Sequence, residues 1–196
     1  MAMDEKALYK ITYGLYVVSA QAEGQRSGCV VNTLQQVTAE PVRLAVTVNK
    51  DSLTCQLIQK AGRFAAVALD QRADMMAIGR FGFRTGRDMD KFEGIPCKED
   101  AAGMPYPTAT ACAHYSCKVE QTVDLGTHLL FVGLAEESEI LTEDEPLTYS
   151  YYRNVIKGLT PKGAPSYQAK KKKGKGEGPR ESGALFAAFI NLPRPA

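Results

Sequence analysis

One segment of the sequence combines the side chains and the local pattern that a phosphate group needs. Asn49–Thr54 (NKDSLT) stands where a strand pattern gives way to a helical one. The start of a helix presents unpaired backbone N–H groups and a positive dipole potential, to which Lys50, Ser52 and Thr54 add a charge and hydroxyl donors. The segment is therefore a candidate phosphate site, although an Asp or Ser at this place is also an ordinary helix cap.

Two further segments could contribute to the same chemistry. Arg80–Lys91 (RFGFRTGRDMDK) is a polar, glycine-containing loop. Its Arg84, Arg87 and Lys91 could clamp a phosphate, although a basic loop of this kind is more often a solvated surface loop. Ser27–Thr33 (SGCVVNT) enters a strand and offers polar side chains at its end.

A histidine occupies the connection between two long strand patterns. His128 closes the segment Asp124–His128 (DLGTH), which reads as a turn. A histidine there can donate to a ligand or titrate near neutral pH, and a lone histidine in a turn is usually solvated. It is a candidate for proton transfer or ligand contact only if other groups lie beside it.

The cysteines raise the question of a metal site. Cys112, His114 and Cys117 are three possible soft ligands within six residues. On a strand, Cys112 and His114 share one face while Cys117 points the other way, and no fourth ligand is evident. We interpret them as side chains of a half-buried strand and predict no metal. The five cysteines are odd in number and form no CxxC pair, so reduced thiols are expected.

Sequence motifs of dinucleotide and nucleotide folds are missing. Gly174–Gly178 matches the spacing of a dinucleotide-binding loop only superficially, because it follows four lysines and no helix pattern follows it. Gly158–Gly163 has the spacing of a Walker loop, but Ala164 stands where the lysine is needed. The sequence contains no HExxH or GxSxG either. A Rossmann unit is therefore not supported.

The elements that must position these residues are mostly short strands. The strand patterns cover Ile11–Ala20, Cys29–Thr38, Val42–Asn49, Phe64–Leu69, Tyr115–Leu125, Leu129–Glu137 and Leu147–Tyr152. Between the first two, Gln21–Gly28 reads as a polar turn. Strands at short intervals with few crossover helices predict a mainly β, antiparallel barrel with a few peripheral helices rather than a doubly wound sheet.

Two helices are expected within this barrel. Leu53–Ala61 has helical spacing, with Asp51 or Ser52 as its N-cap. Gln71–Phe81 reads as a second helix. Its apolar side would consist of Met75, Met76, Ile78 and Phe81.

Composition and charge exclude several classes of function. The chain has 196 residues, of which 44% are hydrophobic and 23% charged, as in an ordinary globular domain. We expect a folded domain at 1–167 and a basic tail at 168–196 that ends in a short apolar segment. The basic excess lies on the tail, so nucleic-acid binding is not expected. No apolar run approaches a membrane span, and Met1–Lys10 is charged where a signal peptide would be apolar, which predicts a cytoplasmic protein.

Taken in order, these segments resemble one protein family. The matching stretches are Ile11–Val18, Gly28–Thr38, Val48–Thr54, Phe81–Phe92, Asp124–Val132 and Thr148–Tyr167. They resemble the flavin reductase-like domain family, which folds as an FMN-binding split β-barrel of Greek-key type. Within that family the sequence is most similar to the flavoredoxin and high-molecular-weight rubredoxin branch.

The resemblance implies a site for non-covalently bound FMN, usually at a homodimer interface. It implies that Asn32 and Thr33 lie beside the isoalloxazine ring, and that Lys50, Ser52 and Thr54 hold the ribityl chain and phosphate. Lys91 would reach the flavin or its phosphate, with Arg84 and Arg87 as helpers. As the catalytic residue, His128 would contact the ring or line the hydride-donor pocket, and Tyr151 or Tyr152 would approach the flavin, across the dimer in one arrangement.

The implied activity is hydride transfer from NADH or NADPH to the flavin, followed by electron transfer to a separate acceptor such as rubredoxin. No cysteine follows Cys117, so the iron site of a rubredoxin module is absent from this sequence. Two alternatives remain open: a flavoredoxin-like electron carrier without NAD(P)H activity, and a flavin reductase that uses FMN as a dissociable substrate. The sequence does not distinguish NADH from NADPH.

Overall fold

The computed structural model describes residues 4–160. The basic tail expected at 168–196, and the end of the domain expected at 1–167, lie outside the described residues.

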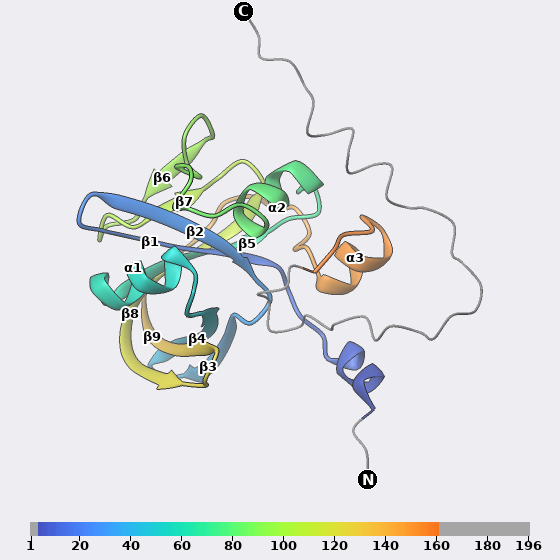
Figure 1. The fold of residues 1–196 in the computed structure, drawn as a ribbon, viewed down its shortest axis with the longest axis horizontal. Helices are drawn as coiled ribbons and strands as arrows, with labels where there is room; N and C mark the ends of the chain where they lie inside the picture. Colours follow the sequence, from blue (N-terminus) through green and yellow to red (C-terminus); the bar gives the residue numbers. More distant parts are fainter. Residues whose placement is uncertain (1–3, 161–196) are drawn as a thin grey trace, which may run out of the picture.

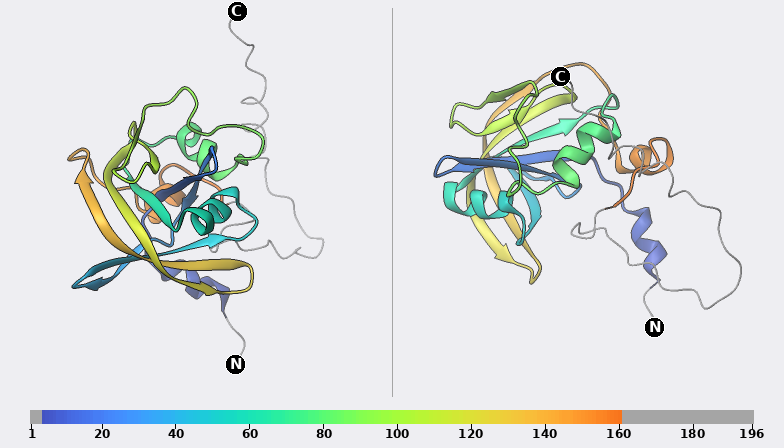
Figure 2. Two further views of the ribbon diagram at one scale, coloured as in Figure 1. Left: turned by 90° about the vertical axis from the view of Figure 1, so that its left-hand side faces the viewer. Right: turned by 45° about the horizontal axis from the view of Figure 1, so that its top comes forward.

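A single curved sheet forms the body of the molecule (Figure 1, Figure 2). Seven strands follow one another in the order β2-β1-β5-β8-β9-β4-β3, and every pairing is antiparallel. Their bounds are β1 Tyr16–Ala22, β2 Gln25–Val31, β3 Gln35–Ala39, β4 Val42–Asn49, β5 Arg63–Leu69, β8 Ala111–Asp124 and β9 His128–Ile140. The predicted mainly β, antiparallel architecture is confirmed.

Smaller elements cover this sheet. A two-stranded hairpin is made of β6 Cys97–Glu99 and β7 Pro105–Pro107. The helices are α1 Leu53–Ala61, α2 Met75–Gly82 and α3 Tyr149–Asn154, and a short 3-10 helix, η1, covers Glu5–Lys10. Both α3 and η1 lie at the end of the molecule away from the β1–β2 turn (Figure 1, Figure 2).

The core fills the concave side of the sheet. Many of its largest buried side chains come from strands and from α1, which packs on β1 and β2, and Ile78, Phe92 and Leu147 add to them from α2 and two loops. They include Val17, Val46, Phe64, Phe131, Leu57 and Ile58. Burial of this apolar surface is the main stabilising contribution. It also holds the ends of β4 and β9 in a fixed place.

Helix α1 follows its sequence pattern closely. Ser52 is the N-cap, and its Oγ accepts a hydrogen bond from the Cys55 backbone N–H. At the other end Gly62 takes a left-handed conformation with φ 64° and its N–H donates to the Ile58 carbonyl. The predicted bounds and the predicted Ser52 cap are therefore confirmed.

The predicted turn at Gln21–Gly28 is wrong. β1 runs to Ala22 and β2 starts at Gln25, so only Glu23 and Gly24 turn the chain. β2 is an edge strand in which Ser27 is buried and Arg26 pairs with Asp90, so its polar residues do not mark a loop. The single run expected at Cys29–Thr38 is also divided, because the chain bends between β2 and β3.

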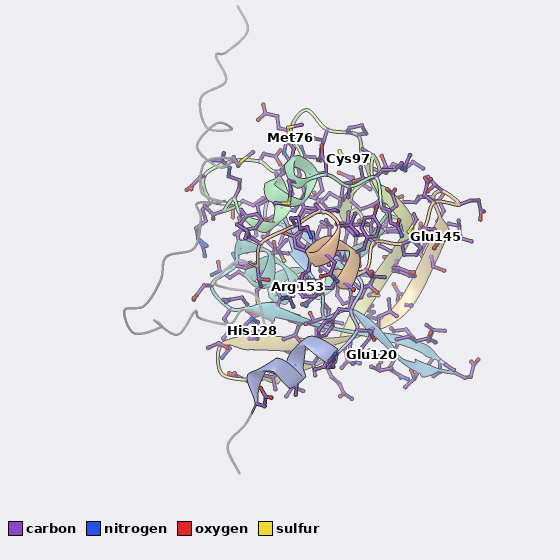
Figure 3. All side chains as sticks on the ribbon, turned by 90° about the vertical axis from the view of Figure 1, so that its right-hand side faces the viewer. Met76, Cys97, Glu120, His128, Glu145 and Arg153 are labelled. Carbon is purple, nitrogen blue, oxygen red and sulfur yellow. The ribbon has the colours of Figure 1, made fainter. Side chains whose placement is uncertain are left out.

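Two other local predictions need correction. Leu147–Tyr152 is not a strand: isolated bridges such as Gly14↔Thr148 precede α3, which Thr148 caps by accepting from the Tyr151 N–H. In α2, Asp74 caps the start, and Met76 is 78% exposed rather than part of the apolar side (Figure 3).

Candidate functional site

The end of β4 brings Lys50 and His128 together. Asn49 faces His128 in the β4–β9 register, and the Lys50 backbone N–H donates to the Thr127 carbonyl at 3.1 Å. The Lys50 ammonium pairs with Asp124, and this hydrogen bond holds the pKa of that carboxyl below its ordinary value. His128 lies at the start of β9, with Nδ1 2.8 Å from the Thr127 hydroxyl (Figure 3).

The first turn of α1 lies directly beyond Lys50. The Ser52 N–H donates to the Asn49 carbonyl, which places the Ser52 hydroxyl at the helix start. Helix N-terminal N–H groups and a nearby lysine form the donor set that a phosphate monoester requires. This part of the predicted phosphate site is therefore assembled in space.

Thr54 faces the interior. Its side chain is 1% exposed, and its hydroxyl donates to Ser27 Oγ at 3.1 Å. The contact ties α1 to β2. Its expected contact with a ribityl chain or phosphate stays a prediction, and the hydroxyl has a structural partner in place.

The loop between α2 and β6 reaches the same helix start. Arg87 donates from Nη1 to the Asp51 carbonyl at 3.1 Å. Gly86 allows this approach, since a Cβ there would lie 2.3 Å from Ser27 Oγ. Arg84 lies on the same loop with its side chain exposed. Arg87 is thus the loop cation that the structure brings next to the segment Asn49–Thr54.

Lys91 faces the interior of the body. It is 4% exposed, and its ammonium donates to the carbonyls of Gly28 at 2.8 Å and Phe81 at 3.1 Å. Burial lowers the pKa of Lys91, and the nearby Cys29 thiol opposes this shift. The side chain joins β2 to the end of α2, so its expected reach to a flavin stays a prediction.

Hydrogen bonds hold the turn between β2 and β3 next to β4. Thr33 donates from Oγ1 to the Thr47 carbonyl at 2.8 Å and accepts from the Thr47 N–H at 3.2 Å. Asn32 is buried next to it. Because Thr47 lies two residues before Asn49, one strand end gathers several predicted site residues. We call this group the β4 rim; it consists of Asn32, Thr33, Lys50, Ser52 and His128.

Tyr152 lies on α3 and faces the interior. Its ring is 3% exposed, and its hydroxyl donates to the Leu159 carbonyl at 2.7 Å. Burial raises the pKa of Tyr152 to about 12. Tyr151 is half-buried on the same helix. The expected approach of Tyr151 or Tyr152 to a flavin stays a prediction.

A large cavity opens beside the β4 rim. Its volume is about 1090 Å³, and its walls come from the chain before β1, the β2–β3 turn and α3. Asn32 and Thr33 line it together with Tyr149 and Arg153, which the sequence analysis missed. We call it the α3 cavity. Only the tyrosine-rich composition of 149–152 pointed to this wall, and nothing local indicated which strand ends it would face.

Within residues 4–160 no three His, Cys, Asp or Glu side chains are grouped so that they could hold a metal ion. Cys112, His114 and Cys117 are all buried. β8 pairs regularly with β5 from Ala113 to Lys118, so His114 and Cys117 lie on opposite faces as predicted, whereas the β5–β8 register shifts next to Cys112. No helix of the described chain is long and apolar enough to cross a membrane.

The family model for the flavin reductase like domain matches residues 8–160, which is most of the chain. The chain belongs to this family. A flavin reductase like domain accounts for the curved antiparallel sheet.

Two curated relatives are 41% identical to this member of the family. One is a high molecular weight rubredoxin of Moorella thermoacetica, aligned over 88% of this chain and 76% of the relative. The other is a ferric-chelate reductase (NAD(P)H) of Archaeoglobus fulgidus, aligned over 84% of this chain and 98% of the relative.

Solved structures of flavin reductase like proteins share the fold. Nitrilotriacetate monooxygenase component B from Mycobacterium thermoresistibile has a TM-score of 0.65 at 24% identity, covering 74% of this chain and 79% of the other. Flavin reductase HpaC complexed with NADP+ has a TM-score of 0.64 at 20% identity, covering 74% and 90%. These likenesses establish the split-barrel fold.

The residues of this chain fit a flavin mononucleotide. The start of α1 and Lys50 supply donors for its phosphate, and Asn32 and Thr33 supply polar atoms at the edge of a cavity large enough for a ring system. All of these groups belong to, or adjoin, the β4 rim.

Proposed function

We propose that the protein is an NAD(P)H-dependent oxidoreductase that binds FMN at the β4 rim and passes electrons to a separate acceptor. The observation that carries this proposal is the 41% identity to a ferric-chelate reductase (NAD(P)H) over 98% of that relative. The donor set of the β4 rim supports it independently, since it matches a phosphate-bearing aromatic cofactor.

Each element of the β4 rim has a part in holding the cofactor. Lys50, Ser52 and the first N–H groups of α1 bind the phosphate. Arg87, which donates to the Asp51 carbonyl, adds a positive charge next to them. Asn32 and Thr33 orient the ring edge. Thr33 is itself held by two hydrogen bonds to Thr47, which keeps that edge rigid.

Bound FMN supplies the redox chemistry, accepting a hydride and releasing electrons. The chain needs no nucleophile of its own. Burial raises the pKa of Cys55 to about 11 and that of Cys117 to about 12, so both thiols stay protonated and inert. His128 contacts the ring or lines the pocket of the hydride donor, with its Nδ1 beside the Thr127 hydroxyl.

The acceptor is a separate redox protein. A relative that is a high molecular weight rubredoxin supports an electron-transfer role of this kind. The functional unit is a cytoplasmic homodimer with FMN at its interface. The domain extends over 1–167, and 168–196 forms a basic tail.

One spectrum tests the activity. The purified protein is dialysed, its visible flavin absorbance is recorded under anaerobic conditions, and NADH and then NADPH are added. Bleaching by either nucleotide is expected. Yellow protein that neither nucleotide bleaches would instead indicate an electron carrier. Colourless protein that bleaches added FMN would indicate a reductase with dissociable flavin, and absence of any flavin binding would refute the assignment.

A further inference from the structure

The α3 cavity has a cationic lining. Lys10 and Arg153 contribute positive charges, and none of the described residues that line the cavity is acidic. The smaller cavity of about 610 Å³ near the β1–β2 turn is different, because Glu23, Asp88 and Asp90 line it and outnumber the cations Arg26 and Arg87 there. Of these two cavities, the α3 cavity is therefore the one suited to an anion.

Aromatic rings accompany these charges. The Arg153 guanidinium lies 6.0 Å from the centroid of the Tyr149 ring. Tyr13 meets Tyr149 edge to face, at 6.0 Å between centroids and 87° between planes. A guanidinium over an aromatic ring is a platform that suits a planar base next to a phosphate.

The position of Arg153 links this platform to the β4 rim. Arg153 lies on α3, and His128 lies at the start of β9 (Figure 3). Asn32 and Thr33 belong both to the β4 rim and to the cavity wall. A dinucleotide whose nicotinamide meets the flavin ring there can extend its adenosine end toward α3.

We propose that Arg153, assisted by Lys10, binds the 2′-phosphate of the donor's adenosine and makes NADPH the preferred donor over NADH. This inference rests on the proposed function. In Rossmann folds an acidic residue binds the ribose hydroxyls of NADH, whereas an arginine accommodates the 2′-phosphate of NADPH, and the same charge argument applies to a cavity of another fold. The α3 cavity has the arginine and lacks the acidic residue among its described lining. A guanidinium also binds a phosphate dianion through paired hydrogen bonds.

Calorimetric titration tests the inference without turnover. The probes are adenosine 2′,5′-bisphosphate and adenosine 5′-monophosphate, titrated into protein kept saturated with FMN so that the start of α1 is occupied. The 2′,5′-bisphosphate is expected to bind about tenfold or more tightly than the monophosphate. Arg153→Gln is expected to remove most of that preference, and Lys10→Gln part of it.

Lys157→Gln is the matched control. It removes one charge from the segment that follows α3 without altering the cavity lining. This variant is expected to keep the preference. Equal binding of the two probes, absence of binding by both, or a preference that survives Arg153→Gln would overturn the inference.

Steady-state kinetics provides the second readout. The ratio of kcat/KM for NADPH to that for NADH is expected to exceed one, and to fall about tenfold or more in Arg153→Gln. Failure of both nucleotides to reduce the bound flavin would refute the proposed function. In that case the calorimetric preference still decides whether Arg153 recognises a 2′-phosphate.

Discussion

Ser52 has two roles that one substitution separates. It caps α1 through the Cys55 N–H, and we assign it to the FMN phosphate. Ser52→Asp keeps a good cap but places a negative charge beside the phosphate. FMN affinity is expected to fall about tenfold or more, while the free energy of unfolding changes by less than about 0.5 kcal/mol. Fluorescence titration with FMN and thermal unfolding measure the two effects.

Asp74→Ala is the control for this prediction. Asp74 caps α2 by accepting from the N–H groups of Met76 and Ala77, away from the β4 rim. Its loss should cost about 1 kcal/mol of stability and leave FMN affinity unchanged. A Ser52→Asp protein that binds FMN as well as the native chain would exclude the start of α1 as the phosphate site.

His114 is a second residue whose environment makes a prediction. It is fully buried and stacks on Tyr106 at 3.8 Å between ring centroids, and neither ring nitrogen has a hydrogen-bond partner among the described residues. Burial lowers the pKa of His114, while Glu137, Asp100 and Glu139 oppose the shift and Lys98 adds to it. The ring is thus held in its neutral form.

Stability should therefore decrease on mild acidification. As the pH falls below 6.5, the ordinary pKa, the unfolded chain takes up a proton before the folded one does. The free energy of unfolding then drops by at most about 1.4 kcal/mol per pH unit until the pH passes the lowered folded pKa. His114→Phe keeps a ring on Tyr106 and should remove this contribution, as urea unfolding between about pH 8 and pH 5 would measure.

His128→Gln is the natural comparison, because the chain has two histidines. A substitution at His128 should leave the contribution of His114 in place. If His114→Phe unfolds with the same pH dependence as the native chain, then His114 is not the group responsible.

At the scale of elements, local signals predicted what local interactions determine. β4 and α1 were predicted with the bounds that the structure has, since alternation and a Ser cap act within a few residues. α3 was missed because its tyrosines favour strands, while Thr148 and contacts to Tyr13 and Leu15 set its start. In α3, contacts with distant segments outweigh the strand propensity of the tyrosines.

In the candidate site, too, the features set by local sequence were predictable and those set by distant contacts were not. The helix start at Ser52 and the turn histidine were visible as patterns, and the β4–β9 register brings Lys50 to His128. The inward direction of Thr54 and Lys91 was not visible, because it depends on partners 27 and 63 residues away in sequence. The same holds for Arg153, whose cavity is built from distant segments.

Two glycines on neighbouring elements predict opposite effects. A Cβ on Gly79 of α2 meets only Phe83 at 3.9 Å, so Gly79→Ala should stabilise the protein by about 0.5–1 kcal/mol. A Cβ on Gly86 collides with Ser27, so Gly86→Ala should destabilise it by about 1–3 kcal/mol and push Arg87 away from α1. Thermal unfolding checks the signs, and equal effects would contradict the packing described for this loop.

At the scale of the whole molecule, the β4 rim has an apolar border. Val123 and Leu125, in the β8–β9 hairpin that carries Asp124, are 44% and 54% exposed. Apolar side chains beside a cofactor site are often covered by a partner. Together with the open position of Lys50, they support a dimer in which the second subunit completes the flavin site.

Dimerisation and FMN retention should therefore be coupled. Sedimentation velocity, followed through both protein and flavin absorbance, is expected to show a species of twice the 21.3 kDa chain mass that carries the flavin. On dilution, or in Leu125→Glu, monomer and free flavin should appear together, because the partner's surface is lost along with the apolar contact. Met76→Glu, at a residue that is 78% exposed on α2, is the control and should remain a flavin-bound dimer. A monomer that sediments with its flavin would mean that one chain completes the site, and the border at Val123 and Leu125 would then need another explanation.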